Sequence, residues 1–160
     1  MTRQSATDVK DRIFGTLVYL LALFSALPFG GFLLRQFPIL QLIEVPLLPV
    51  FLVYNLLGPL AGLVVFAGLY FGVVRNERIS HFIRFNTLQS VLIGIALSIV
   101  GLLWSILTPA LASIPLLLET LANTVFLAVV VASGFSIFQA VQGQYPELPV
   151  FSEAASSQLR

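Results

Sequence analysis

Four long stretches of this sequence contain neither lysine nor arginine and consist almost entirely of apolar residues. They cover residues 13–30, 50–74, 87–107 and 115–141. A helix needs about 20 such residues to cross the hydrocarbon core of a bilayer. With 58% hydrophobic residues, 9% charged residues and a mean hydropathy of +1.00, the chain has more apolar side chains than a soluble domain of 160 residues can bury. We therefore predict an all-α integral membrane four-helix bundle over residues 1–149, followed by a loose tail at 150–160.

The segment 31–49, between the first two stretches, is apolar but interrupted by three prolines. Backbone that proline breaks cannot face lipid, because its freed polar groups would find no partner there. We expect this segment at the membrane interface, with a short helix around 32–37. A re-entrant segment that lines a pore is the alternative.

The basic residues predict the orientation of the chain. With four spans, both ends and the loop 75–86 lie on one side of the membrane. That side has seven basic residues, Arg3, Lys10, Arg12, Arg75, Arg78, Arg84 and Arg160, whereas the other side has only Arg35. Short loops rich in lysine and arginine stay in the cytoplasm. We therefore expect both ends on the cytoplasmic or stromal side.

Pro59 lies inside the second apolar stretch. It has no N–H to donate, so the carbonyl of Asn55 one turn earlier is left free. We predict a kink near Asn55 and Pro59. It is either a bend that improves packing or a hinge beside a polar cavity.

Glu119 lies one turn into the fourth stretch, where an acidic side chain is costly unless it is paired. Arg35 is the one cation on the same side of the membrane. We expect an ion pair between Arg35 and Glu119, or between Arg35 and Glu44. A polar vestibule on that side is the alternative.

Small residues recur four positions apart in every predicted helix, for example at Ala22, Ala26 and Gly30 and at Gly68 and Gly72. Small residues let the backbones of membrane helices approach closely. The pattern indicates tight helix packing, either within one chain or between copies.

The densest polar run, 74–89, leads from the second stretch into the third. If it is helical from Arg78 onward, Phe82, Asn86 and Gln89 share one face. Asn86 and Gln89 enter the membrane, so they should form hydrogen bonds to other helices. The run is either a cationic anchor with a polar clamp or a docking or gating surface on the cytoplasmic face.

Several classes of function are excluded or disfavoured. The chain has no cysteine and one histidine, His81, so we expect no metal site. It contains no HExxH, GxSxG, P-loop or GxGxxG motif, so we expect no catalytic residues and no cofactor. The net charge of +1 disfavours nucleic acid as a partner.

Two runs carry a resemblance to a known family: Tyr-Phe-Gly-Val-Val-Arg-Asn at 70–76, and Ile-Ser-His-Phe-Ile-Arg-Phe-Asn at 79–86 with Gln89 after it. They resemble the signature of the Tic-twenty family, the small four-helix membrane subunits of the protein translocon at the inner envelope of chloroplasts. The resemblance covers roughly residues 12–149. It includes the proline-rich first loop, Tyr54 with Pro59, and the Tyr-Pro-Glu-Leu-Pro run at 145–149.

The resemblance implies a core component of a protein-conducting translocon with both termini in the stroma or cytoplasm. The short N-terminus is similar to the cyanobacterial or plastid-encoded branch, which implies a cyanobacterial plasma or thylakoid membrane or the plastid inner envelope. The family's signature carries over to seven residues here: Arg75, Asn76, His81, Arg84, Phe85, Asn86 and Gln89.

Three functions remain open from the sequence. The chain is a translocon or channel subunit, a non-conducting scaffold or assembly factor, or a small ion or solute channel. Side chains fill the centre of one four-helix bundle, so conduction of a polypeptide requires oligomers, partner subunits or a groove open to lipid. The expected partners are membrane lipid, other membrane subunits or further copies of the chain, and a translocating preprotein.

Overall fold

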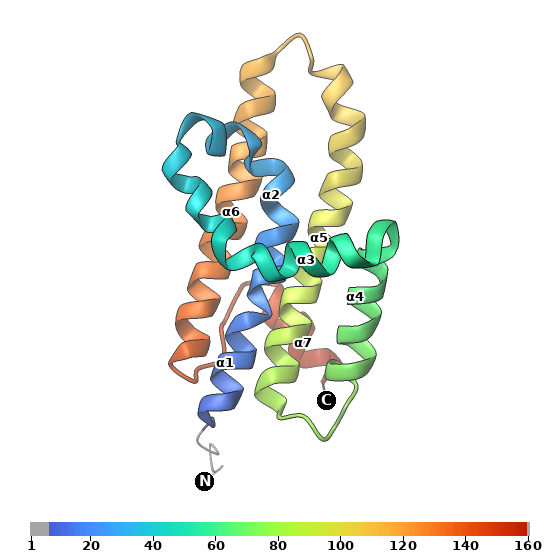
Figure 1. Ribbon diagram of the computed structural model, residues 1–160, viewed down its shortest axis with the longest axis vertical. Helices are drawn as coiled ribbons and strands as arrows, with labels where there is room; N and C mark the ends of the chain where they lie inside the picture. The colour runs from blue at the N-terminus through green and yellow to red at the C-terminus, as the bar shows by residue number, and fades with distance from the viewer. Residues whose placement is uncertain (1–6, 160) are drawn as a thin grey trace.

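The computed structural model describes residues 7–159, which form ten helical segments and, in that range, no strand. The molecule is an elongated helix bundle (Figure 1). Both described ends lie at one end of the bundle together with the loop 75–80, and the loop 111–114 lies at the opposite end. We refer to these as the terminal end and the far end.

Four helical stretches are long and apolar enough to cross a membrane, as the sequence predicted. They are Val9–Gln36, Pro38–Val74, His81–Ala110 and Pro115–Val141. The first consists of α1 (Val9–Leu17) and α2 (Tyr19–Gln36), which follow each other with only Val18 between them. The Asp8 side chain caps α1 by accepting from the N–H of Val9 at 2.7 Å. The third and fourth spans are single helices, α5 (His81–Ala110) and α6 (Pro115–Val141).

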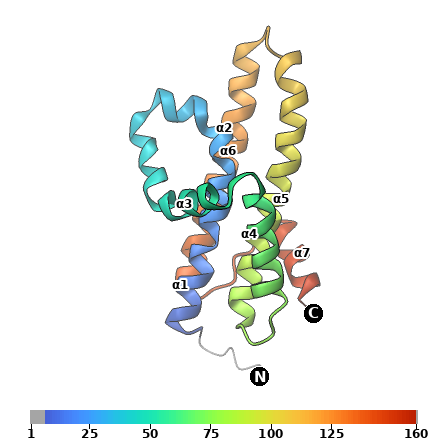
Figure 2. The same ribbon diagram turned by 45° about the vertical axis from the view of Figure 1, so that its right-hand side comes forward.

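The second span is not one straight helix, which differs from the helix expected over 50–74. It has five segments: the 3₁₀ helix η1 (Pro38–Leu47), α3 (Leu48–Leu57), the 3₁₀ turn η2 (Gly58–Leu60), α4 (Ala61–Leu69) and the π-helical turn η3 (Tyr70–Val74). In Figures 1 and 2, α3 lies across the bundle at a large angle to α2 and α5, and α4 then runs along the terminal half of α5.

The break between α3 and α4 occurs at Gly58, whose φ of 64° and ψ of −145° suit a residue without a Cβ. Pro59 follows at the start of η2. The chain therefore turns here instead of continuing through a kinked helix. The expected short helix around 32–37 is also different, because α2 itself continues to Gln36.

The core forms around α2, which packs mainly on α6 and α5. Its buried face consists of Tyr19, Ala22, Ala26 and Phe29, which meet side chains of both partner helices. A Cβ at Gly30 would lie only 2.7 Å from the ring of Phe126 on α6, so the glycine permits this close approach. The predicted small-residue stripe on this span therefore marks the interface between α2 and α6.

The C-terminal residues correct another expectation. The tail at 150–160 was predicted to be loose, but Phe151–Gln158 form α7, and Ala155 is fully buried beside Phe85 and Leu88. Phe151, Ala155 and Leu159 recur four positions apart and give α7 one apolar face. Arg160 lies outside the described residues, as does Arg3.

The contact at Gly30 gives a first testable prediction. Gly30→Val should lower the free energy of unfolding by about 1–3 kcal/mol, because the added methyl groups overlap the Phe126 ring. The measurement is reversible unfolding in detergent followed by circular dichroism. Gly68→Val is the matched control, since a Cβ at Gly68 would meet nothing within 4 Å. Equal losses for both variants would contradict the assigned role of Gly30.

Candidate functional site

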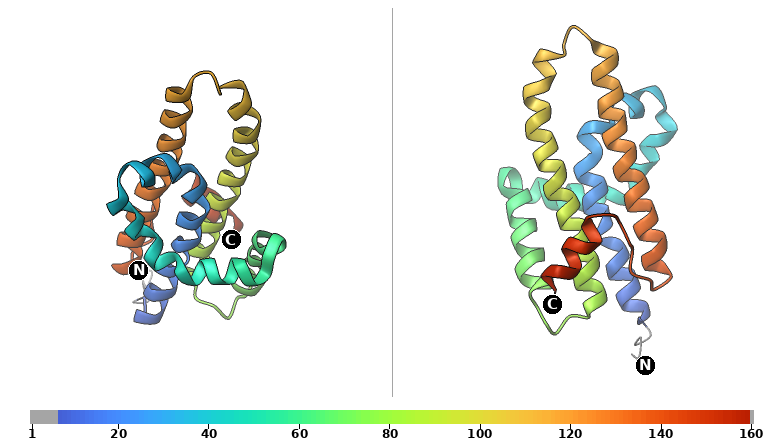
Figure 3. Two further views of the ribbon diagram at one scale, coloured as in Figure 1. Left: turned by 45° about the horizontal axis from the view of Figure 1, so that its top comes forward. Right: turned by 180° about the vertical axis from the view of Figure 1, so that it is seen from behind.

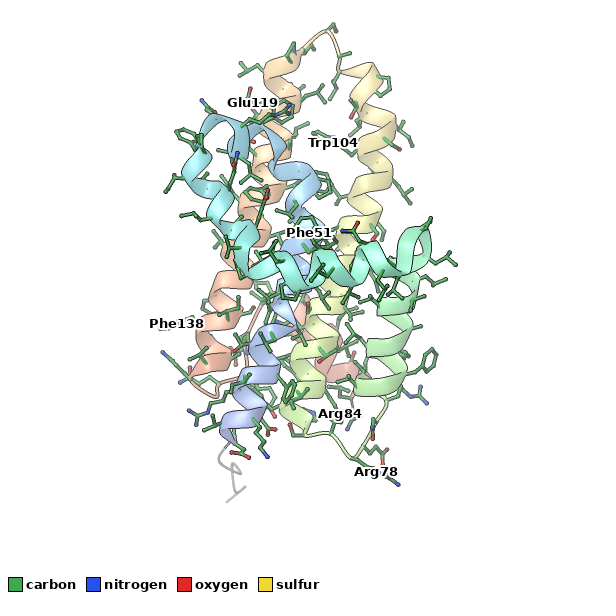
Figure 4. The ribbon with its side chains drawn as sticks, in the orientation of Figure 1. Phe51, Arg78, Arg84, Trp104, Glu119 and Phe138 are labelled. Atoms are coloured by element: carbon green, nitrogen blue, oxygen red, sulfur yellow. The ribbon has the colours of Figure 1, made fainter. Side chains whose placement is uncertain are left out.

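The polar run 74–89 forms the loop 75–80 and the first turns of α5, at the terminal end of the bundle. Arg78 and Arg84 are labelled there in Figure 4. Arg84 Nε donates to the carbonyl of Val74 at 2.8 Å, which joins α5 to the end of η3. The Ser80 hydroxyl caps α5 by accepting from the N–H of Ile83 at 3.4 Å.

The loop before α5 has its own hydrogen bond. The Asn76 side chain accepts from the N–H of Arg78 at 3.1 Å. Arg75 and Arg78 are exposed, and Asn76 is half-buried. Asn76 and Arg84 thus order the loop, while Arg75 and Arg78 remain available to lipid headgroups or to a partner.

Asn86 is fully buried and connects the third span to the first. Its Oδ1 accepts from the Tyr19 hydroxyl at 2.9 Å, and its Nδ2 donates to the Phe82 carbonyl at 2.8 Å. One turn further on, the Ser90 hydroxyl donates to the carbonyl of Val18 at 2.6 Å. This carbonyl lies at the junction of α1 and α2, so two side chains of α5 attach to the same point of the first span.

Gln89 is fully buried too, but both polar atoms of its amide lack a hydrogen-bond partner among the described residues. The Ser133 hydroxyl on α6 and the Thr87 hydroxyl on α5 are in the same state. Ser136, one turn from Ser133, lies beside the Tyr19 hydroxyl. The terminal half of the bundle thus has a buried polar layer that the chain itself satisfies only in part.

The exposed and aromatic members of the run contact the segment 142–150, which we call the strap. The ring centre of Tyr145 lies 5.2 Å from that of Phe82 and 5.1 Å from that of Phe85. Its hydroxyl shares a hydrogen bond of 3.1 Å with His81 Nδ1. Burial, with a smaller contribution from the charge of Asp11, raises the pKa of Tyr145, so its hydroxyl keeps its proton near neutral pH.

A basin of about 1130 Å³ lies in front of these residues at the terminal end. It is lined by His81 and Tyr145 and by three carboxylates, those of Asp8, Asp11 and Glu147, with Arg12 beside them. Among residues 7–159, no group of three histidine, cysteine, aspartate or glutamate side chains could hold a metal ion.

A second hollow, the lateral groove, opens between α2, the η1–α3 segment and α5. Its volume is about 920 Å³, and its lining includes Phe24, Phe29, Arg35, Glu44, Tyr54 and Trp104. A smaller cavity of about 210 Å³ continues it toward α4 and shares Ser25, Tyr54, Gly62 and Ser98 with it. The sequence did not predict this groove, because it exists only where α3 crosses the bundle.

The other residues singled out from the sequence lie apart from the buried polar layer. Asn55 is exposed on α3, and Pro59 lies in η2. Arg35 Nε donates to the Gly31 carbonyl at 2.8 Å, and its guanidinium lies 5.7 Å from the Phe32 ring centre. In the described part of the chain, neither the pair with Glu119 nor the pair with Glu44 is formed, although Arg35 and Glu44 line the same groove. Arg35 instead lies in the last turn of α2, where the free carbonyls favour a cation.

Two residues of the site were missed in the sequence. Tyr19 is the only polar aromatic residue in the first span, and Ser90 is a small residue that directly follows the polar run 74–89. Tyr19 on α2 and Ser90 on α5 each form a hydrogen bond that attaches α5 to the first span. A buried tyrosine needs a hydrogen-bond partner, and this requirement was the one available signal for Tyr19.

Comparison with known proteins identifies the family. The family described as "Chloroplast import apparatus Tic20-like" matches residues 6–155. The chain belongs to the Tic20 family. The Tic20 family protein of Synechocystis sp. is 45% identical over 160 residues, which cover 100% of this chain and 99% of that protein.

Plant and algal relatives of this Tic20-family chain agree with the match. Protein TIC 20-v, chloroplastic, of Arabidopsis thaliana is 30% identical over 154 residues, covering 96% of the chain and 73% of that protein. The Tic20 family protein Ycf60 of Porphyra purpurea is 32% identical over 164 residues, covering 99% and 80%. The family indicated by the polar run is therefore confirmed, with relatives in a cyanobacterium and in plastids. The description of the family names a chloroplast import apparatus.

The hydrogen bond between Tyr19 and Asn86 gives a second prediction. Asn86→Leu should cost about 1–2 kcal/mol of unfolding free energy, because it leaves the buried Tyr19 hydroxyl without an acceptor. Adding Tyr19→Phe should recover part of that loss. The measurement is a double-mutant cycle in detergent, with Asn55→Leu on the exposed face of α3 as the control. Strictly additive losses would show that the two side chains do not interact.

Proposed function

We propose that this chain is an integral membrane component of a protein-translocation complex and acts together with partner subunits or further copies of itself. The observation that carries the proposal is the match of almost the whole chain to the family of the chloroplast import apparatus. The fold supports it, because four apolar spans make the chain a resident of the bilayer.

The need for partners follows from packing. Side chains of α2, α5 and α6 fill the centre of the bundle, so a single chain has no room for a hydrated polypeptide there. Large apolar side chains on the outer surface, such as Leu56 and Leu116, are 87% and 75% exposed and suit lipid or another membrane subunit. A Cβ at Gly62, Gly68 or Gly72 of the α4 region would meet nothing within 4 Å. This open face supports assembly with another helix.

We propose that both termini and the loop 75–80 face the cytoplasm or stroma. Lys10, Arg12, Arg75, Arg78 and Arg84 belong to the terminal end, and Arg35 belongs to the far half (Figures 1 and 4). This orientation is supported because short loops rich in lysine and arginine stay in the cytoplasm. The membrane is a cyanobacterial plasma or thylakoid membrane, or the inner envelope of a plastid.

A non-conducting scaffold or assembly factor is the second candidate. Asn86 acts as a satisfied clamp between helices, which is the arrangement that favours a scaffold. A small ion or solute channel within one chain has less support. Its polar candidates are dispersed: Ser98 lines the lateral groove, Gln89 is fully buried, Asn55 is exposed on α3, and Glu119 lies in the far half of α6 (Figure 4).

Orientation can be tested cleanly because the natural chain contains no cysteine. Single cysteines at Arg78, in the loop 75–80, and at Ser113, in the loop 111–114, are treated with a membrane-impermeant maleimide in intact cells. The Ser113→Cys variant should be labelled at once, and the Arg78→Cys variant only after the membrane is permeabilised. The opposite pattern would overturn the proposed orientation.

The partner class can be tested by photo-crosslinking in intact membranes. A photo-reactive amino acid in place of the exposed Arg78 or His81 should give adducts with preproteins or with other membrane subunits, identified by mass. Leu102, which is 69% exposed in the far half of α5, is the matched control and should give adducts with lipid. If Arg78 and His81 also capture only lipid or the chain itself, the translocation role is rejected.

A further inference from the structure

The strap fills the seam between the terminal halves of α5 and α6. α5 and α6 contact each other little, since α2 packs between them from the other side. In the rear view of Figure 3, the strap leaves the end of α6, runs up between the two helices and turns into α7, which lies over α5. Residues 144–148 have no regular secondary structure, so the seam holds a peptide in an irregular conformation.

The strap is held mainly by side chains. Tyr145 packs against Phe82 and Phe85, Pro146 is fully buried, and Leu148 is 8% exposed within the main hydrophobic core. Glu147 points out and is exposed. Within residues 7–159, few hydrogen bonds join the strap to the spans: Tyr145 bonds to His81, and residues 142, 143 and 144 bond to the end of α6. The Thr7 hydroxyl, just before α1, also donates to the Gly143 carbonyl at 3.0 Å. Packing of the partly exposed Tyr145 ring and burial of Pro146 and Leu148 therefore provide most of the contact, and such contacts accept other sequences with the same spacing.

The helices on both sides of the seam carry the unsatisfied polar groups. Gln89 lies on α5 between Phe85, which contacts the strap, and Ile93, which shares the main core with Leu148. Ser133 lies on α6 one turn after Val129, which belongs to the same core. The polar side chains of Gln89 and Ser133 are fully buried and have no hydrogen-bond partner among residues 7–159. In a membrane, such groups suit the backbone of a peptide, which presents N–H and carbonyl groups along its length.

The end of the strap is strained. Val150 has a φ of 69°, a conformation that is costly for a β-branched residue. It persists because the strap is anchored on one side by Tyr145 and on the other by Ala155, which is fully buried in α7. Release of the strap removes this strain, which lowers the cost of exchanging the strap for another peptide.

We propose that the seam between α5 and α6 is a binding groove for an extended polypeptide segment, and that the strap occupies it until such a segment displaces the strap. The segment carries an aromatic residue followed three positions later by a large aliphatic one, as Tyr145 and Leu148 do. This inference rests on the proposed function, because it specifies the feature of a translocating polypeptide that the chain binds. The groove lies at the terminal end of the bundle, which faces the cytoplasm or stroma in the proposed orientation.

The first test measures opening of the seam. Ser133→Cys in the otherwise natural chain should resist a small maleimide, because the hydroxyl it replaces is fully buried. With Tyr145→Ala and Leu148→Ala added, labelling should become at least about tenfold faster, because the strap then opens locally at lower cost. Gln142→Cys, which is exposed, is the control and should react equally in both backgrounds. An unchanged rate at position 133 would overturn the inference.

The second test measures occupancy by a peptide in trans. The probe is a biotinylated peptide with the sequence of residues 142–151 and a benzophenone amino acid in place of Tyr145, added to the full chain in vesicles. It should cross-link to the first turns of α5 in the Tyr145→Ala, Leu148→Ala variant and much less in the natural chain. The control peptide keeps the benzophenone amino acid at position 145 and has serine in place of Leu148. Equal cross-linking by both peptides would overturn the groove.

A reversible lock separates this inference from the proposed function. Leu88→Cys with Ala155→Cys joins two buried neighbours of α5 and α7 and, once cross-linked, holds the strap in place. Phe24→Cys with Phe51→Cys, at a contact of α2 with α3, is the matched control lock. The cross-link between positions 88 and 155, but not the control cross-link, should block entry of the peptide. It should also block capture of preproteins by a photo-reactive amino acid at position 78, and a reductant should restore both. Capture that persists under the first lock overturns the groove and leaves the translocation role intact. Lock-sensitive peptide entry without any preprotein capture supports the groove and rejects the translocation role.

Discussion

In hydrocarbon, a polar group has no water to bind and must find its partner inside the protein. The terminal half of this bundle is organised by that requirement. The Asn86 side chain accepts a hydrogen bond from the Tyr19 hydroxyl, and the Ser90 hydroxyl donates one to the carbonyl of Val18. These two bonds attach the third span to the point where α1 meets α2. This attachment determines the position of α2 between α5 and α6. It therefore also determines the width of the seam that the strap fills.

The far half of the molecule follows a different rule. There α3 crosses the bundle and the second span packs on α5 only through α4 and η3, so the lateral groove remains open beside α2. Arg35 and Glu44 line that groove without pairing. The tightly packed terminal half carries the polar run 74–89 of the family, whereas the open lateral groove lies in the far half. The molecule thus presents two surfaces of different chemistry.

Much of the fold could be predicted because hydropathy is a local property. The ends 115 and 141 of the fourth helix agree with α6, since proline and a change to polar sequence bound it. The path of the second span could not be predicted in the same way. Gly58, Pro59 and the earlier prolines permit a turn, but they do not specify the direction of the chain after it. In the site, the shared face of Phe82, Asn86 and Gln89 could be predicted from helical spacing, whereas the partners Tyr19 and Tyr145 are 67 and 64 positions away from Asn86 and His81 along the chain.

The sequence by itself determined that the chain has four apolar helical stretches, that it belongs to the bilayer, and which family it joins. Each of these is encoded in runs of neighbouring residues. Tertiary structure alone decided that α3 crosses the bundle and that the C-terminal residues fold back as strap and α7. It also decided that, within residues 7–159, the Asn86 amide has hydrogen-bond partners while the Gln89 amide has none. These depend on the space left between helices after α2 has packed, and no local pattern specifies that space.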